Sequence, residues 1–347
     1  MTREEILELL RSVRHPGQGD RTLEELGMIH SIEGSTVTLA FSKRRDPLAE
    51  YLIGATRAAL IRGGVKDPEV KTVVLDEAAP KKKAPEFSLE TLTGVRHIVG
   101  VASGKGGVGK STVAVNLACA LARLGYKVGL ADADVYGPSV PLMTGTEGAT
   151  PMAEEVDGRE LILPLEKWGV KWMSIGYFAS RGQALIWRGP MASNALKQMI
   201  LQVKWDDLDF LLVDMPPGTG DIHISLLQEV PMEGAILVTT PQDVALADVE
   251  KGANMFRNKQ IARPIFGLVE NMAWFTPEEH PEEKYYIFGR DGGARMAEEL
   301  GIELLGRIPL VQSIRESGDA GTPVALGSRP DSQAFLALAG KLAEKLG

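Results

Sequence analysis

The sequence predicts an α/β protein in which a mostly parallel sheet, flanked by helices, follows a small α+β domain. Apolar runs with little polar alternation recur after residue 95, which is typical of strands buried on both faces. Segments with helical spacing separate these runs, so we expect the strands to lie parallel. The residues before 76 follow a different pattern and indicate a separate domain.

A change in composition divides the chain. The stretch 77–94 mixes Pro, Ala, Lys and Glu without apolar periodicity, as a linker does. We therefore expect a small α+β domain over 1–76, a linker over 77–94 and a larger domain over 95–347. In the small domain, the patterns predict a helix carrying Ile6, Leu9, Leu10 and Val13 on one face, strands at 35–42 and 70–76, and a helix at 46–64.

The larger domain shows the strand–helix alternation. Its predicted strands are 97–103, 127–134, 209–218, 234–241, 265–271 and 304–310. Its predicted helices lie near 110–124, 190–203, 243–260 and 293–300, and a C-terminal amphipathic helix at 332–347 is expected to pack on the sheet rather than on a membrane.

Composition excludes some classes of protein. The net charge of −8 disfavours binding of nucleic acid by bulk electrostatics. No apolar run reaches the roughly 18 residues of a membrane span, and the acidic start "MTREEILELLRSVR" lacks a signal-peptide core. We expect a cytoplasmic protein with no nucleic-acid or membrane partner.

One glycine-rich segment carries a phosphate-binding pattern. "GKGGVGKST" fits G-x-x-x-x-G-K-[ST] between a predicted strand and a predicted helix, which indicates a P-loop NTPase that binds ATP and Mg²⁺. Lys110 would reach the β- and γ-phosphates, Ser111 would hold Mg²⁺, and Thr112 would lie near the α-phosphate. The predicted nucleotide-binding residues of this loop are Gly104, Lys105, Gly106, Gly107, Val108, Gly109, Lys110, Ser111 and Thr112.

The loop contains a second lysine, Lys105. It is either a solvated side chain or a charge presented to a nucleotide across a dimer interface, where a cation can raise the rate of phosphoryl transfer by roughly 10³–10⁵. The loop resembles the deviant Walker A motif of dimeric ATPases that include the nitrogenase iron protein, cell-division site regulators and plasmid partition ATPases. That resemblance implies the in-trans role for Lys105.

Three aspartates and one asparagine follow predicted strands. Asp132 and Asp134, in "LADADVYGPSVP", would face the ligand crevice, unless they only cap the strand. We expect Asp132 in the Mg²⁺ shell and, from the same resemblance, Asp134 as the residue that orients water. Asp214, in "LLVDMPPGTGD", fits a Walker B carboxylate that binds Mg²⁺. Asn271 either recognises adenine, as the resemblance implies, or is a turn residue.

Further sequence segments indicate which family of these ATPases the chain resembles. "DADVYGPSVP", "DMPPGTGD", "VENMAWF", "IFGRDGG" and "LLGRIPL" resemble the Mrp/ApbC family of iron–sulfur cluster carrier ATPases over about residues 95–330. "VRHPGQG" and "LEELGMI" resemble the small domain associated with iron–sulfur assembly factors. The resemblance implies a homodimer, a [4Fe–4S] cluster, and iron–sulfur apoproteins or assembly factors as partners.

The sequence departs from that family where the cluster ligands are expected. The C-x-x-C pair after "ENM" is replaced by a segment that contains Thr276 and Pro277, and the small domain has "SKRRDPLAE" in place of Thr-Pro-x-Cys-Pro. The chain has one cysteine, Cys119, whose apolar neighbours favour a core position over a ligand. A metal site is the alternative to a solvated loop at Glu278, Glu279, His280, Glu282 and Glu283.

We therefore predict a slow, dimer-dependent ATPase that serves iron–sulfur assembly without the usual cluster ligands. Two alternatives remain. One is a nucleotide-switched dimeric adaptor that binds no cluster, and the other is a partition-type ATPase.

Overall fold

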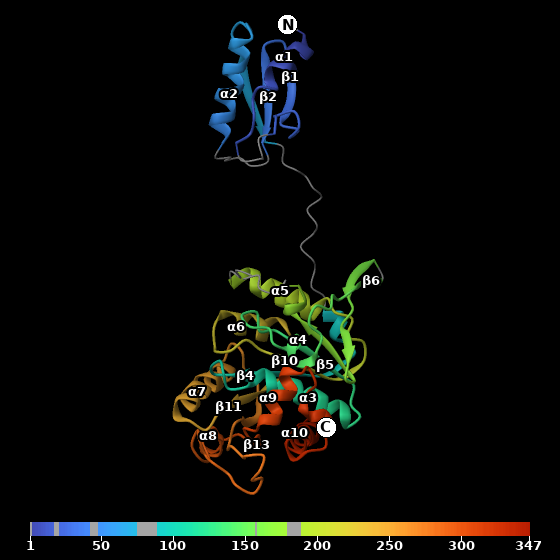
Figure 1. Ribbon diagram of the computed structural model, residues 1–347, viewed down its shortest axis with the longest axis vertical. Coiled ribbons are helices and arrows are strands. Elements are labelled where there is room, and N and C mark those ends of the chain that lie inside the picture. The colour runs from blue at the N-terminus through green and yellow to red at the C-terminus, as the bar shows by residue number, and fades with distance from the viewer. Residues whose placement is uncertain (1, 17–20, 42–47, 75–88, 157, 179–188) are drawn as a thin grey trace. The chain divides into compact units, whose positions relative to one another are not determined.

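The computed structural model describes residues 2–16, 21–41, 48–74, 89–156, 158–178 and 189–347. The chain divides into two compact units, Met1–Glu86 and Phe87–Gly347 (Figure 1). Residues 77–88 of the predicted linker lie outside the described residues, as does most of "SKRRDPLAE". The end of that linker range packs on the second unit, where Leu92 is buried and Thr91 Oγ1 donates to Leu201 O at 2.9 Å.

The first unit is a three-stranded sheet with two helices. Its elements are α1 (Arg3–Leu10), β1 (Ile29–Glu33), β2 (Thr36–Phe41), α2 (Ala49–Arg62) and β3 (Glu69–Val74). β2 lies in the centre, antiparallel to β1 and parallel to β3. The parallel pair requires a crossover, which α2 supplies. Leu10, Leu39 and Leu52 lie in the core of this unit.

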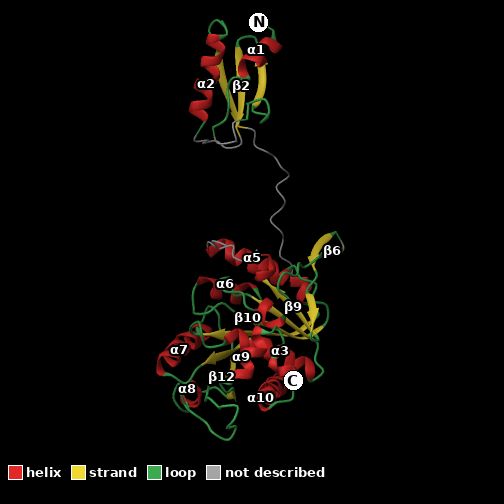
Figure 2. Ribbon diagram, in the orientation of Figure 1, coloured by secondary structure: helices red, strands yellow, loops and turns green. Residues whose placement is uncertain are grey.

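The second unit is built on an eight-stranded sheet (Figure 2). The strand order is β13-β12-β11-β4-β10-β5-β9-β8, and every pair is parallel except β8 with β9. The strands are β4 (Val95–Ser103), β5 (Val128–Asp132), β8 (Leu165–Lys167), β9 (Val170–Ser174), β10 (Leu208–Asp214), β11 (Gly234–Thr239), β12 (Ile265–Glu270) and β13 (Leu304–Arg307). A separate hairpin is formed by β6 (Ala153–Val156) and β7 (Arg159–Ile162).

Helices cover both faces of this sheet. The remaining elements are η1 (Leu89–Leu92), α3 (Lys110–Arg123), α4 (Val140–Thr144), η2 (Ile175–Phe178), α5 (Gly189–Leu201), α6 (Asp221–Glu229), α7 (Asp243–Arg257), α8 (Gly292–Leu300), α9 (Gln312–Asp319), η3 (Val324–Leu326) and α10 (Pro330–Leu346). Phe210 and Leu212 of β10 share one core with α3 and α10, whereas Leu211 and Val213 share another with α5 to α8. Burial on both faces explains why these strands lack polar alternation.

The expected fold class is confirmed, and the predicted strands and helices of the larger domain form. The C-terminal helix α10 packs on the sheet at β13, as expected, and also against α3. The sequence patterns missed β1, the strands from β6 to β9, and helices α4, α6 and α9. Among the described residues, no helix is both long and apolar enough to cross a membrane.

The strand order fixes where a ligand can bind. The chain leaves β4 through α3 and enters β5 on one side of β4, while β11 lies on its other side. Such a switch point opens a crevice at the carboxyl ends of the strands. Asp214 pairs in register with Asp132 and Val101, so the ends of β10, β5 and β4 meet there.

Candidate functional site

The phosphate-binding loop connects β4 to α3 through residues 104–109. Gly107 and Gly109 have φ angles of +84° and +79°, a region that side chains with a Cβ rarely adopt. A Cβ on Gly104 would lie 2.2 Å from the carbonyl oxygen of Asp248 in α7, so only glycine fits there. These glycines let the loop curl in front of α3, whose N-terminal amides favour anions.

A buried ion pair lies behind the loop. Lys110 Nζ binds Asp214 Oδ1, and the two side chains are 5% and 0% exposed. Lys110 Nζ also lies 3.3 Å from Ser111 Oγ and 3.9 Å from Asp134 Oδ2. The structure therefore brings together four of the predicted site residues from three separate segments.

The second oxygen of Asp214 supports a cation site. Asp214 Oδ2 is buried and has no hydrogen-bond partner among the described residues. Burial raises the pKa of Asp214, and the charge of Lys110 opposes that shift. A carboxylate oxygen left unpaired beside a serine hydroxyl suits Mg²⁺, which prefers oxygen ligands. The donor set of Ser111 and Asp214 therefore fits the predicted metal.

Asp132, which was expected to face the ligand crevice, is enclosed at the end of β5. It is fully buried, and Oδ2 accepts hydrogen bonds from Ser174 Oγ at 2.8 Å and Val140 N at 3.3 Å. Oδ1 accepts from Asp134 N at 3.2 Å. Burial and the neighbouring Asp214 raise the pKa of Asp132 to about 7. In this structure, Asp132 ties the loop after β5 to β9 and α4, and its place in the Mg²⁺ shell stays a prediction.

Asp134 lies in the loop that Asp132 ties down. Its Oδ1 accepts hydrogen bonds from Tyr136 N at 3.2 Å and Gly137 N at 3.3 Å. Its Oδ2 faces Lys110 at 3.9 Å. The carboxylate is thus oriented by local backbone and lies beside Lys110, and its role in orienting water stays a prediction.

Asn271 connects the loop to a cavity. Its Nδ2 donates to Val108 O at 2.8 Å, and its backbone N–H donates to Thr239 O at 2.7 Å. The side chain lines a cavity of about 280 Å³ beside α3, together with Thr112 and Asn116. Pro309 and Arg315, near the start of α9, also line it. Thr112 belongs to α3, the helix that begins where the phosphate loop ends, so the cavity adjoins the loop, and recognition of adenine by Asn271 stays a prediction.

The sequence patterns did not predict that residues between 309 and 319 line this cavity. The only signal was the predicted strand at 304–310, which places the next residues of the chain at the carboxyl edge of the sheet. A larger, open hollow of about 540 Å³ lies at the opposite edge, where it is lined by Lys127, Val170 and Leu208. None of the predicted site residues lines this hollow, whereas Thr112 and Asn271 line the smaller cavity.

Lys105 is half-buried at the start of the loop. Its carbonyl accepts a hydrogen bond from Ser103 Oγ at 2.9 Å. Within the described part of the chain, no carboxylate lies within 4.0 Å of Lys105 Nζ. No ion pair among those residues therefore holds the side chain within its own protomer.

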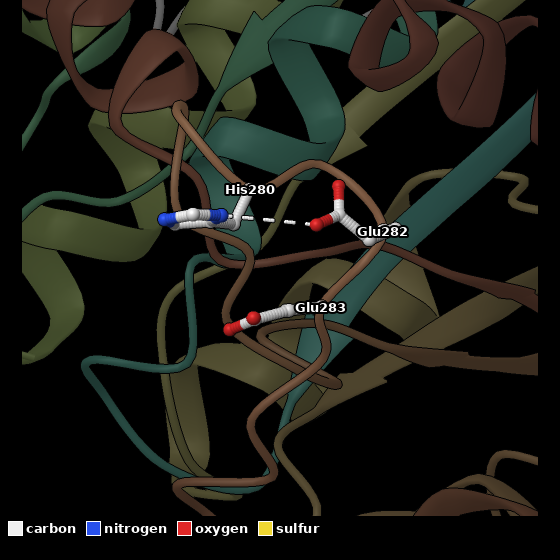
Figure 3. Close-up of side chains that lie close together, drawn as sticks. All are labelled: His280, Glu282 and Glu283. Carbon is white, nitrogen blue, oxygen red and sulfur yellow. Dashed lines mark ion pairs between the residues drawn. The ribbon is translucent and has the colours of Figure 1, made fainter.

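The other candidate cluster lies in the loop after β12 (Figure 3). His280, Glu282 and Glu283 place ligand atoms within 4.8 Å of one another, and His280 Nδ1 lies 3.7 Å from Glu282 Oε1. Both of these side chains are more than half exposed, and Glu283 accepts a hydrogen bond from Tyr285. This geometry is compatible with both expectations, a solvated loop and a metal site, and each stays a prediction.

Cys119 occupies the core, as predicted. It is fully buried in α3, and burial raises its pKa to about 12. A thiol in that position is protonated and inaccessible, so it is not a ligand for a metal at the protein surface.

The loop, the buried Lys110–Asp214 pair and the switch-point crevice define a P-loop NTPase. Solved structures agree with this class. A nucleotide-binding protein in complex with ADP from Archaeoglobus fulgidus is 34% identical, with a TM-score of 0.60, and the match covers 71% of this chain and 94% of that one. The cell-division ATPase MinD of Pyrococcus furiosus has the same fold, with a TM-score of 0.50 and 24% identity over 72% of this chain and 98% of that one.

Sequence comparison gives the family. A family model of the ParA group, described as NUBPL iron-transfer P-loop NTPase, matches residues 94–345. An iron–sulfur cluster carrier protein of Synechocystis is 42% identical over 100% of this chain and 98% of its own length. Its counterpart in Escherichia coli is 48% identical over 74% of this chain and 67% of its own length. The chain belongs to the iron–sulfur cluster carrier P-loop NTPases, the Mrp/ApbC family.

Gly109→Ala should destabilise the nucleotide-free protein more than Gly107→Ala does. Both changes force a Cβ into the left-handed region, at a cost of roughly 1–2 kcal/mol. Only the Cβ at Gly109 would lie 2.2 Å from Asn271 Nδ2, whereas Gly107 has open space. Displacing Asn271 would cost about 1 kcal/mol more. Urea unfolding of both variants measures the difference, and equal losses would contradict the contact.

Proposed function

We propose that this protein is a slow, dimer-dependent ATPase that assembles or delivers iron–sulfur clusters. The convergence of Lys110, Ser111, Asp134 and Asp214 beside a base-sized cavity carries the proposal of ATP hydrolysis. Membership of the iron–sulfur carrier family supports the cellular role. The closed dimer is supported by the likeness to dimeric ATPases and by Lys105, which pairs with no carboxylate among the described residues.

The residues divide the chemistry among them. The loop amides and the N-terminus of α3 would bind the triphosphate, and Lys110 would exchange Asp214 for the β- and γ-phosphates. Ser111 and Asp214 would hold Mg²⁺, which neutralises charge on the phosphates when it is bound. Asp134 would orient the attacking water. Lys105 of the partner subunit would stabilise charge on the transferred phosphoryl group.

The chain lacks the residues that ordinarily bind an iron–sulfur cluster. Thiolates are the ordinary ligands of iron–sulfur clusters, and the single cysteine is buried. We therefore propose that a partner protein holds the cluster while this chain supplies nucleotide-driven motion. The buried Cys119 also favours a second candidate function, an adaptor that never contacts a cluster.

Lys110→Ala should weaken binding of ATP about 10- to 100-fold, because a charge-assisted contact to phosphate is lost. The variant also leaves Asp214 buried without its partner, which costs roughly 3–5 kcal/mol. Lys110→Met with Asp214→Asn removes both charges and serves as the folded control. Isothermal titration with ATP measures affinity, and normal affinity in either variant would place the phosphate site elsewhere.

Lys105→Ala should retain ATP affinity but lower turnover about 10³-fold, since its charge acts only on the transferring phosphoryl group. Wild-type activity per protomer should rise with protein concentration as dimers form. Steady-state phosphate release at several concentrations checks both statements. Unchanged turnover in Lys105→Ala would remove the in-trans role.

Anaerobic reconstitution with iron and sulfide separates the carrier from the adaptor. If clusters travel on a partner protein, the purified chain should gain no stoichiometric cluster absorbance. It should nevertheless accelerate cluster transfer from a loaded assembly protein to an apoprotein when ATP is present. A stable cluster on the isolated chain would defeat the partner-held model, and no acceleration would favour the adaptor.

A further inference from the structure

His223 is a buried residue that neither the sequence motifs nor the family assignment places in the site. It lies in the first turn of α6 and is 3% exposed. Its Nε2 lies 2.7 Å from the carbonyl oxygen of Pro216. That carbonyl belongs to the turn that follows Asp214, so the ring reaches back from α6 toward the ion pair.

The turn from Met215 to Gly218 makes two backbone hydrogen bonds to other parts of the chain. Met215 N donates to Val101 O at 3.0 Å, and Gly218 N donates to Ser103 O at 3.1 Å. Between them, Pro216 and Pro217 have no N–H to donate. Both of these hydrogen bonds go to residues of β4. Among the described residues, the hydrogen bond from His223 to Pro216 is therefore the one that joins the turn to a side chain of α6.

This turn is connected to the start of the phosphate-binding loop by hydrogen bonds. Gly218 N donates to Ser103 O at 3.1 Å, and Ser103 Oγ donates to Lys105 O at 2.9 Å. A movement of the Pro216 carbonyl would therefore displace Gly218 and, through Ser103, the backbone of Lys105 at the start of the loop.

The protonation state of the ring follows from its partners. A carbonyl oxygen only accepts, so Nε2 must carry the proton. Nδ1 is buried and has no hydrogen-bond partner among the residues that the structure describes. Burial lowers the pKa of His223 and outweighs the carbonyl oxygens of Pro216 and Gly220, which favour the charged ring. The ring is thus a neutral donor with one unpaired acceptor.

We infer that His223 is a positioning residue that fixes the Pro216–Pro217–Gly218 turn against the phosphate-binding loop. A ring retained only for packing would gain nothing from a buried polar nitrogen without a partner, since an unpaired buried acceptor costs free energy. The Nε2 bond to Pro216 is what the histidine supplies and an apolar residue of similar size does not. The inference rests on the proposed ATPase for its kinetic readout.

Two amide substitutions separate positioning from packing. Glutamine places its amide nitrogen where Nε2 of histidine lies, whereas asparagine places it near Nδ1. His223→Gln should keep the bond to Pro216, and His223→Asn should lose it, although both bury an amide. We expect kcat to fall roughly tenfold in His223→Asn, with KM for ATP within about threefold of wild type, and both constants to stay near wild type in His223→Gln.

A second readout does not need hydrolysis. Amide hydrogen exchange at Gly218 should quicken about tenfold in His223→Asn and stay unchanged in His223→Gln. If wild-type protein hydrolyses no ATP, the proposed function fails, and the exchange rates still decide the role of His223. If His223→Asn does not fold, His223→Leu replaces it, because leucine fills the site without a donor. Equal behaviour of the glutamine and donor-less variants, in turnover or in exchange, would overturn the inference.

Discussion

The nucleotide site depends on one buried ion pair, Lys110 with Asp214. Taking two charges out of water is costly, so such a pair persists only where each partner is well placed. Here it joins the start of α3 to the end of β10, the strand that lies between β4 and β5. The pair also holds Lys110 and Asp214 beside the phosphate-binding loop. A bound triphosphate would attract the ammonium of Lys110, and Mg²⁺ would then take its place beside the carboxylate of Asp214. Each buried charge would therefore have an opposite charge next to it both before and after the nucleotide binds.

Much of the fold was predictable because the central strands are buried on both faces and leave unbroken apolar runs. Asp132, Asp134 and Asp214 were found because parallel strands end at a common edge. The deep burial of Asp132 was not predictable, since it depends on Ser174 from a strand that carries no sharp periodicity. The cavity wall near Pro309 and the bond from His223 to Pro216 were also missed, because both arise from packing between segments that no local pattern links.

The family and the chain disagree on one chemical point. Relatives carry the name of iron–sulfur cluster carriers, whereas this sequence has a single thiol and that thiol is enclosed in α3. The exposed His280 and Glu282 and the half-buried Glu283 offer harder ligands of a kind that clusters rarely use. Family membership therefore supports the iron–sulfur role, whereas the residues of this chain do not include the thiolate ligands that would hold a cluster.

The enclosure of Cys119 has a practical consequence. With a pKa of about 12 and no access to solvent, it presents almost no thiolate to maleimides or other alkylating dyes at neutral pH. A cysteine introduced at one exposed position would therefore accept a fluorophore alone, without prior removal of the native residue. Chains labelled with donor and acceptor dyes could then be mixed, and energy transfer between them would report whether two copies associate when each nucleotide is added.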